Sequence, residues 1–190
     1  MANTTSEQAK VWDLAIRLFH WSLVAAFAIS YITEDEWLTL HTNSGYFIAA
    51  LLIFRILWGF AGSRHARFRD FVYSPSTIID YLRKSLRFQS PRYLGHNPAG
   101  GAMVVVMLLM LSITVTSGIA LLGASEFAGP MAGLFQGEAA ELLEEVHEAS
   151  ANLMLLLTAL HLGGVLFSSL AHRENLVKAM ITGLKRSNHQ

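Results

Sequence analysis

Four long apolar stretches constrain this chain more than any other feature of its sequence. They lie at roughly residues 14–33, 38–62, 100–123 and 146–171 of the 190 residues. A helix needs about 20 apolar residues to cross a bilayer, so these lengths favour membrane spans over buried helices of a soluble core. We therefore predict an all-α membrane protein, a bundle of four transmembrane helices that forms one domain over residues 1–190.

The segments that connect these spans differ sharply in charge. Residues 63–99 contain seven Lys or Arg against two Asp, and the tail after the last span contains four against one Glu. The other two connections, residues 34–37 and 124–145, contain acidic residues and no Lys or Arg. Because Lys and Arg accumulate on the cytoplasmic side, we predict that both termini and the 63–99 loop are cytoplasmic. The 124–145 loop then lies on the opposite side.

Two segments of these connections are expected to be helical. Ser74-Pro75-Ser76 is a typical helix start, and residues 77–88 can form an amphipathic helix on the cytoplasmic surface. Residues 137–146 are rich in Glu, Ala and Leu and are expected to lead helically into the fourth span.

The composition excludes several kinds of protein. The chain contains no Cys, which excludes disulfides, a thiolate nucleophile, an iron–sulfur cluster and a covalently attached c-type haem. Its formal net charge is zero, whereas a nucleic-acid-binding protein needs a basic excess. Only 15% of its residues are charged, against about a quarter in a soluble domain.

Four of the eight histidines lie in the predicted spans. His20 is near the cytoplasmic end of the first span, His41 begins the second at its outer end, and His147 and His161 share the fourth. Fourteen residues advance a helix by about 21 Å and nearly four whole turns, so the last two rings share one helix face. His161 then lies at the depth of His20, and His147 at the depth of His41. The four rings therefore form two layers, each with two facing imidazoles. Two facing imidazoles are what one six-coordinate haem iron requires in addition to the porphyrin.

Two glycines and two arginines near these histidines are further candidates to contact a haem. Gly45 and Gly164 lie within one turn of His41 and His161, where they could admit a porphyrin plane or serve ordinary helix packing. Arg17 and Arg55 lie at the inner ends of their spans and are candidates to bind haem propionates, although Arg17 could equally extend to lipid headgroups. The remaining histidines are expected to be solvated or to face phosphate; they are His65, His96, His172 and His189.

Several sequence motifs resemble those of one known family. The run VWDLAIRLFHW at 11–21 resembles the opening of the bacterial cytochrome b561 family, which includes the cytochrome b subunits of nickel–iron hydrogenases. FRILWGF at 54–60 and GSRHARF at 62–68 match its second span and the following loop. RYLGHNP at 92–98 resembles the approach to its third span.

The resemblance implies a multi-pass protein of the bacterial inner membrane with four core helices around two non-covalent b-type haems. It places the ligands at His20 with His161 for the inner haem, and at His41 with His147 for the outer haem. It also implies transmembrane electron transfer, with membrane quinone as one redox partner. Whether the chain is itself an enzyme or a subunit of a quinone-linked oxidoreductase is left open, as is its state as a homodimer or part of a larger complex.

The acidic outer connections suggest the second redox partner. We expect them to dock a periplasmic protein, either a basic c-type cytochrome or an oxidoreductase subunit, by electrostatic steering. The alternative is that these loops lack Lys and Arg only because such residues are retained on the cytoplasmic side, and that they dock no partner. Two other functions remain open from the sequence, a passive membrane anchor and a transporter that binds Zn or Cu through the histidines. The acidic residues in question are Glu34, Asp35, Glu36, Glu138, Glu141, Glu144 and Glu145.

Overall fold

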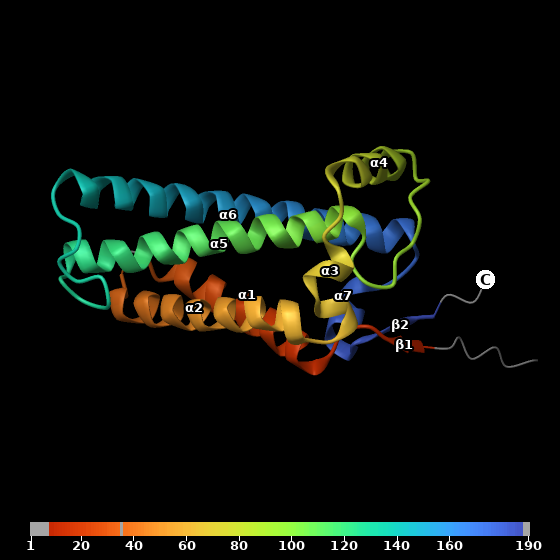
Figure 1. Cartoon of the computed structure of the whole chain (residues 1–190), viewed down its shortest axis with the longest axis horizontal. Coiled ribbons are helices and arrows are strands. Elements are labelled where there is room, and N and C mark those ends of the chain that lie inside the picture. Colours follow the sequence, from red (N-terminus) through yellow and green to blue (C-terminus); the bar gives the residue numbers. More distant parts are fainter. Residues whose placement is uncertain (1–7, 35, 188–190) are drawn as a thin grey trace, which may run out of the picture. The chain divides into compact units, whose positions relative to one another are not determined.

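The computed structural model describes residues 8–34 and 36–187 and is almost entirely helical (Figure 1). Its long helices are α1 (Leu14–Ile32), α2 (Leu38–Ala61), α5 (Pro98–Ser125) and α6 (Glu138–Ala171). The shorter elements are β1 (Gln8–Lys10), the 3₁₀ turn η1 (Arg64–Ala66), α3 (Phe68–Phe71), α4 (Pro75–Leu86), α7 (Leu176–Thr182) and β2 (Leu184–Arg186).

All four long helices are long and apolar enough to cross a membrane. The predicted fold class, an all-α membrane protein, is therefore confirmed. Helix α6 has 34 residues, more than a bilayer requires, so its glutamate-rich first turns extend the membrane-spanning part as the sequence predicted. The amphipathic helix was also predicted correctly: α4 begins at Pro75, and the Ser74 hydroxyl accepts a hydrogen bond from the Thr77 amide.

The described chain divides into two compact units, and each long helix contributes to both. The terminal unit contains the chain up to His20, Arg55–Val105, and the chain from Leu160 onward. The central unit contains Trp21–Phe54 and Val106–Ala159.

The core of the central unit is apolar, but it also contains pairs of hydroxyl groups that are hydrogen-bonded between helices. The hydroxyl groups of Ser30 and Ser44 are 2.6 Å apart, and Thr114 donates to Ser150 over 3.0 Å. Such small polar residues let membrane helices approach closely and link them by hydrogen bonds. The apolar cluster around them takes one or more residues from every long helix: Ala26, Ile48, Leu52, Leu111 and Met154.

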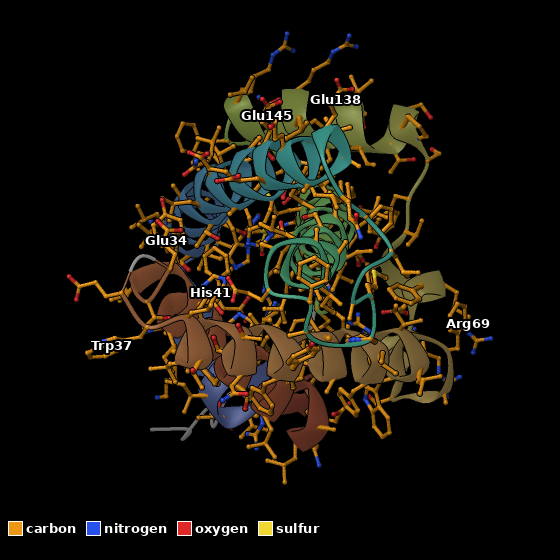
Figure 2. All side chains as sticks on the ribbon, turned by 90° about the vertical axis from the view of Figure 1, so that its left-hand side faces the viewer. Glu34, Trp37, His41, Arg69, Glu138 and Glu145 are labelled. Atoms are coloured by element: carbon orange, nitrogen blue, oxygen red, sulfur yellow. The ribbon has the colours of Figure 1, made fainter. Side chains whose placement is uncertain are left out.

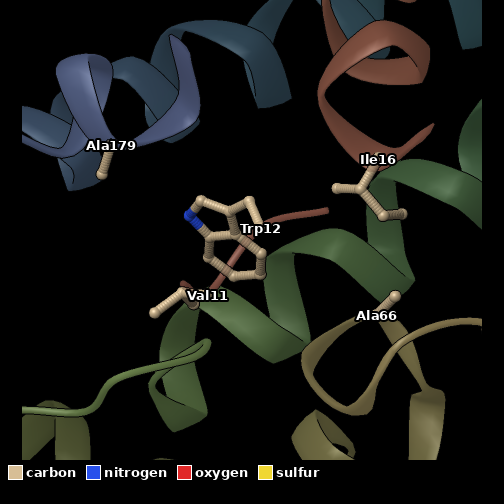
Figure 3. Packing of buried hydrophobic residues seen from close by; sticks show 5 residues of the cluster. All are labelled: Val11, Trp12, Ile16, Ala66 and Ala179. Atoms are coloured by element: carbon tan, nitrogen blue, oxygen red, sulfur yellow. The ribbon is translucent and has the colours of Figure 1, made fainter. Parts of the chain in front are cut away.

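The core of the terminal unit joins the two ends of the described chain. Trp12 is buried there among residues from several elements (Figure 3). Strand β1 pairs with β2 in an antiparallel register, and the amides of Val11 and Trp12 donate to the carbonyl of Gly183 over 2.8 and 3.2 Å. Gly183 ends α7 with a positive φ of 82°, and a Cβ there would lie 2.5 Å from the Trp12 carbonyl oxygen. Glycine is therefore required at this junction. The short sheet was not predicted from the sequence.

A buried ion cluster reinforces the same junction. Lys185 in β2 is 6% exposed, and its ammonium lies 3.7 Å from the Glu174 carboxylate. Arg92 approaches the same carboxylate at 2.7 Å. The loop before α5 and the segment after α6 are thereby linked to the terminal strand.

Asp13 connects the start of α1 to the end of α2. Its carboxylate accepts hydrogen bonds from the Ile16 amide at 2.8 Å, from the Trp58 indole at 3.1 Å and from the Ser63 hydroxyl. Burial alone would raise the pKa of Asp13, but these hydrogen bonds together hold it below the ordinary value of 3.8. Asp13 is therefore ionised at neutral pH and caps the helix as a charged acceptor.

Replacement of Asp13 by Ala should destabilise the terminal unit. The variant loses the helix cap and the hydrogen bonds that Asp13 accepts from Trp58 and Ser63, at a cost of about 1–3 kcal/mol. Thermal unfolding of the detergent-purified protein should show a lower Tm at pH 7, while Asp13→Asn, which keeps a capping oxygen, should lose less. Because the folded pKa is depressed, the stabilisation is complete above pH 3.8 and is lost as the pH falls further. A difference in Tm between wild type and Asp13→Ala that persists unchanged in strong acid would contradict this account.

Candidate functional site

The four histidines of the long helices form two pairs, one in each unit. In the central unit the ring centroids of His41, on α2, and His147, on α6, lie 6.0 Å apart with planes at 81°. In the terminal unit the ring centroids of His20, on α1, and His161, on α6, lie 6.5 Å apart with planes at 50°. The rings that lie together are those expected at the same depth along the predicted spans.

Both separations match two imidazoles that ligate one iron from opposite sides. Each iron–nitrogen bond is about 2 Å and each nitrogen lies about 1 Å from its ring centre, so the centroids then stand roughly 6 Å apart. A direct hydrogen bond or a stacked contact would bring the rings closer. The spacing therefore fits a bis-histidine haem in each unit.

His41 is oriented by the end of a neighbouring helix. Its Nδ1 lies 2.9 Å from the carbonyl oxygen of Ser30. Ser30 is in the last turn of α1, where the carbonyls have no amide donor four residues further along the helix. The imidazole therefore uses an oxygen that no helix amide occupies, and the Thr33 hydroxyl also approaches this oxygen at 3.5 Å.

His147 contacts a backbone carbonyl in the middle of a helix, at a position that a glycine leaves uncovered. Its Nδ1 lies 2.9 Å from the carbonyl oxygen of Thr114 in α5. A Cβ at Gly118, four residues later, would lie 2.6 Å from Cε1 and 2.9 Å from Nδ1 of this imidazole. The missing side chain at Gly118 opens the Thr114 carbonyl to the ring. This role of Gly118 could not be read from the sequence, because it depends on a ring from another helix.

These two hydrogen bonds set the chemical state of the central pair. A carbonyl oxygen only accepts, so Nδ1 of both His41 and His147 must carry a proton and donate it. The neutral ring then presents its lone pair at Nε2, the form in which imidazole binds a metal. A hydrogen bond at the other nitrogen also fixes ring orientation and raises ligand basicity.

A methyl group at position 118 should disrupt the central pair selectively. Gly118→Ala places a carbon within 3 Å of the His147 ring, which must then leave the Thr114 carbonyl. We expect haem per chain, measured as the pyridine haemochrome, to fall from two toward one. Thr116→Ala, an exposed change two residues away on α5, serves as the control and should leave haem content unchanged. Full haem occupancy in Gly118→Ala would show that the ring does not depend on this close approach.

The terminal pair lies in a unit that contains two arginines of interest. Arg55, on α2, is 3% exposed and its guanidinium carbon lies 4.9 Å from the centre of the Phe68 ring. Arg17, on α1, donates from Nη1 to the carbonyl of Ile181 over 2.8 Å. Arg17 is thus partly committed to α7, and Arg55 remains the stronger candidate to bind an anionic group.

The two candidate glycines face open space within the chain. A Cβ at Gly45 or at Gly164 would meet no protein atom within 4 Å. Neither glycine is needed for close packing against the described residues. Their predicted contact with a porphyrin remains a prediction.

The remaining histidines differ from one another in surroundings. His65 donates from Nδ1 to the Asp70 carboxylate at 2.8 Å, and His172 is partly exposed just after α6. His96 is half-buried; its Nδ1 is inaccessible to solvent, and its ring centre lies 4.7 Å from the ring centres of both Trp12 and Phe71. His189 lies outside the described residues.

Comparison with known families agrees with this geometry. The model of the family described as prokaryotic cytochrome b561 matches residues 11–183. The chain belongs to the prokaryotic cytochrome b561 family. No curated protein and no solved structure matches the chain.

Membership makes this cytochrome b561 homologue a multi-pass bacterial membrane protein that binds b-type haem and transfers electrons. The described residues contain no group of three or more His, Asp or Glu side chains that could hold a metal ion. Two imidazoles can complete the coordination of an iron whose other four ligands come from a porphyrin. The histidine pairs therefore suit haem iron, whereas structural zinc requires four protein ligands.

Proposed function

We propose that this cytochrome b561 homologue carries electrons across the bacterial inner membrane between quinone and a periplasmic protein. Two b-type haems would be held by His20 with His161 and by His41 with His147. The observation that carries the proposal is the matched spacing of 6.5 and 6.0 Å between the two pairs of imidazole rings. Membership of the family supplies the class of chemistry.

A haem with two histidine ligands supplies one-electron transfer without an open position for oxygen. The protein residues hold the ligands rigid, since the tethers from His41 to Ser30 and from His147 to Thr114 restrict the imidazoles. Rigid ligands keep coordination the same in both oxidation states, which favours rapid transfer. The apolar side chains of the long helices exclude water from this region.

Single substitutions of the ligands test the two-haem assignment. Each of His20→Ala, His161→Ala, His41→Ala and His147→Ala should retain one b-type haem per chain, because the other pair stays complete. Variants of one pair should share the same residual spectrum and midpoint potential, distinct from those of the other pair. Pyridine haemochrome analysis and potentiometric titration measure both quantities.

His65→Ala is the matched control, since His65 pairs with Asp70 and not with another histidine, and it should keep two haems. The assignment would be contradicted if the two variants of one histidine pair differed in the spectrum and midpoint potential of their residual haem. A colourless wild-type protein would leave the passive anchor or the zinc or copper transporter as its function.

We also propose that the central unit faces the periplasm and docks the partner protein. Glu34 and Glu36 before α2 are exposed, as are the glutamates on the first turns of α6, and the described part of this unit's connections contains no Lys or Arg. In Figure 2 Glu138 and Glu145 lie on the outer side of α6, and Trp37 projects away from the helices. Trp37 is 61% exposed, as expected for an aromatic residue at a membrane interface. Asp35 lies outside the described residues.

The acidic surface is connected electrostatically to the proposed outer ligands. Glu34 is close enough to His147 to interact with it through charge. A basic partner that docks on this surface would therefore approach the haem edge beside His147. Positive charge on the partner would also raise its association rate through long-range attraction.

Neutralisation of the acidic surface should slow electron exchange with a basic c-type cytochrome. The variant Glu138→Gln, Glu141→Gln, Glu144→Gln, Glu145→Gln should lower the second-order rate at low salt by about tenfold or more, and flatten its dependence on ionic strength. Stopped-flow oxidation of the reduced protein measures the rate. Asp80→Asn, on α4 and paired with Lys84 at 2.7 Å, is the control and should not change it. A wild-type rate indifferent to salt would exclude steering by these residues.

A further inference from the structure

Helix α4 has one face against the protein and a second, apolar face that the described residues leave uncovered. On the inner face Tyr81 is buried, and its ring centre lies 5.8 Å from that of Tyr93. On the other face Ile79, Leu82 and Leu86 recur at intervals of three and four residues, so they form one stripe along the helix. All three are exposed, Leu86 by 82%. An exposed apolar stripe of this kind marks a surface for contact with a partner or a membrane.

Helix α4 ends at an exposed aromatic residue in a backbone conformation that favours glycine. The amide of Phe88 donates to the Ser85 carbonyl, and the amide of Gln89 donates to the Lys84 carbonyl, each over 2.9 Å. These two bonds form a Schellman ending, in which Phe88 holds the left-handed position where glycine is usual. Phe88 has a φ of 55° and is 75% exposed. Burial within the chain therefore does little to offset the strain of this conformation.

The Phe88 ring joins the apolar stripe of α4 to the surface of a membrane span. Its centroid lies 5.5 Å from that of Phe167 in α6. Leu166 and Leu170, within one turn of Phe167, are exposed as well, in a helix that is long and apolar enough to cross a membrane. Figure 1 shows α4 beside the last turns of α6. Lipid chains that cover these turns of α6 therefore also reach the end of α4.

Two arginines of α4 lie beside the apolar stripe. Arg83 and Arg87 are exposed and one helical turn apart, so their Cβ atoms are separated by about 5–6 Å. The described residues provide no ion-pair partner for either side chain, whereas the neighbouring Lys84 is paired with Asp80 at 2.7 Å. A guanidinium can bind phosphate through two parallel hydrogen bonds. Two guanidinium groups at this spacing suit the phosphate of an anionic headgroup.

We propose that α4 and the last turns of α6 form a binding site for an anionic phospholipid. Arg83 and Arg87 bind the headgroup phosphate, while the apolar stripe, Phe88 and Phe167 contact the acyl chains. A helix with a basic edge beside an apolar face lies in the plane of the membrane interface. The contact of Phe88 with a membrane span favours lipid over a soluble protein partner. Because a zwitterionic headgroup has no net charge, the two arginines prefer phosphatidylglycerol to phosphatidylcholine.

Native mass spectrometry of the full chain in detergent tests this preference. The probes are phosphatidylglycerol and phosphatidylcholine with identical acyl chains. The wild type should bind phosphatidylglycerol more tightly. The double variant Arg83→Gln, Arg87→Gln should lose about fivefold in affinity for phosphatidylglycerol per arginine and change little toward phosphatidylcholine.

The matched control is the double variant Arg69→Gln, Lys178→Gln. It removes two exposed positive charges from the same unit, and Figure 2 shows Arg69 well away from α4. This control should keep the lipid preference of the wild type. An unchanged preference in Arg83→Gln, Arg87→Gln, or an equal loss in the control, would overturn the proposal.

Replacement of Phe88 by Gly separates lipid binding from folding. Glycine suits the left-handed position, so the Tm of the lipid-free protein in detergent should not fall. The rise in Tm that added phosphatidylglycerol causes should shrink, and Phe88→Leu, which keeps an apolar side chain, should retain more of it. Inorganic phosphate alone should cause no comparable rise, because it makes no apolar contact.

Three further outcomes would overturn the proposal. One is a lower lipid-free Tm in Phe88→Gly with an unchanged lipid-induced rise, because Phe88 would then serve packing alone. Another is a rise in Tm with inorganic phosphate equal to that with phosphatidylglycerol, which would assign the arginines to a free anion. The third is an altered oligomeric state in the α4 variants with unchanged lipid binding, which would assign the stripe to a second copy of the chain.

Discussion

An imidazole in an apolar helical environment must find an acceptor for its N–H, and helices offer few. Almost every helix carbonyl is occupied by the amide four residues later and is shielded by the side chain at that position. The central unit overcomes this limit in two ways. Ser30 provides a carbonyl at the last turn of α1, and Gly118 uncovers the Thr114 carbonyl within α5. Through these acceptors His41 and His147 acquire a fixed tautomer and a fixed orientation.

The two units provide different surroundings for chemically similar histidine pairs. The rings of the central pair contact neutral groups, which are two helix carbonyls and the Ser117 hydroxyl, and Glu34 is the charged residue that acts on His147. The terminal unit contains the buried cation Arg55 and the uncharged His96. A positive charge nearby stabilises the reduced, less positive state of an iron centre relative to the oxidised state. Under the proposed function, the protein thereby sets different affinities for the electron with the same ligand type.

The sequence predicted the features that depend on local pattern. Apolar runs located the long helices, and the spacing of His147 and His161 along α6 predicted which rings meet. It did not predict features that arise when distant segments pack together. Gly118 gains its role only from a ring on α6, and the ring of His96 is partly covered by Trp12 and Phe71, which are far apart in the sequence.

Other contacts between distant segments have no local signal either. Arg17 donates to a carbonyl of α7, a helix that follows the last span, and its predicted contact with a propionate or with lipid remains a prediction. No periodicity in a three-residue strand could announce the pairing of β1 with β2. The acidic connections were visible as composition, and their exposure in the described residues follows simply from their charge.

The pairing of β1 with β2 has a consequence for biogenesis. Residues 8–10 leave the ribosome long before residues 184–186, which are their hydrogen-bonding partners. The Trp12 cluster likewise includes Ala179, so the terminal unit cannot close until residues 179–186 have been synthesised. The central unit uses no residue beyond Ala159 and can assemble earlier during translation. Under the two-haem proposal, insertion of the cofactors would follow the same temporal order, with the site of His41 and His147 completed before that of His20 and His161.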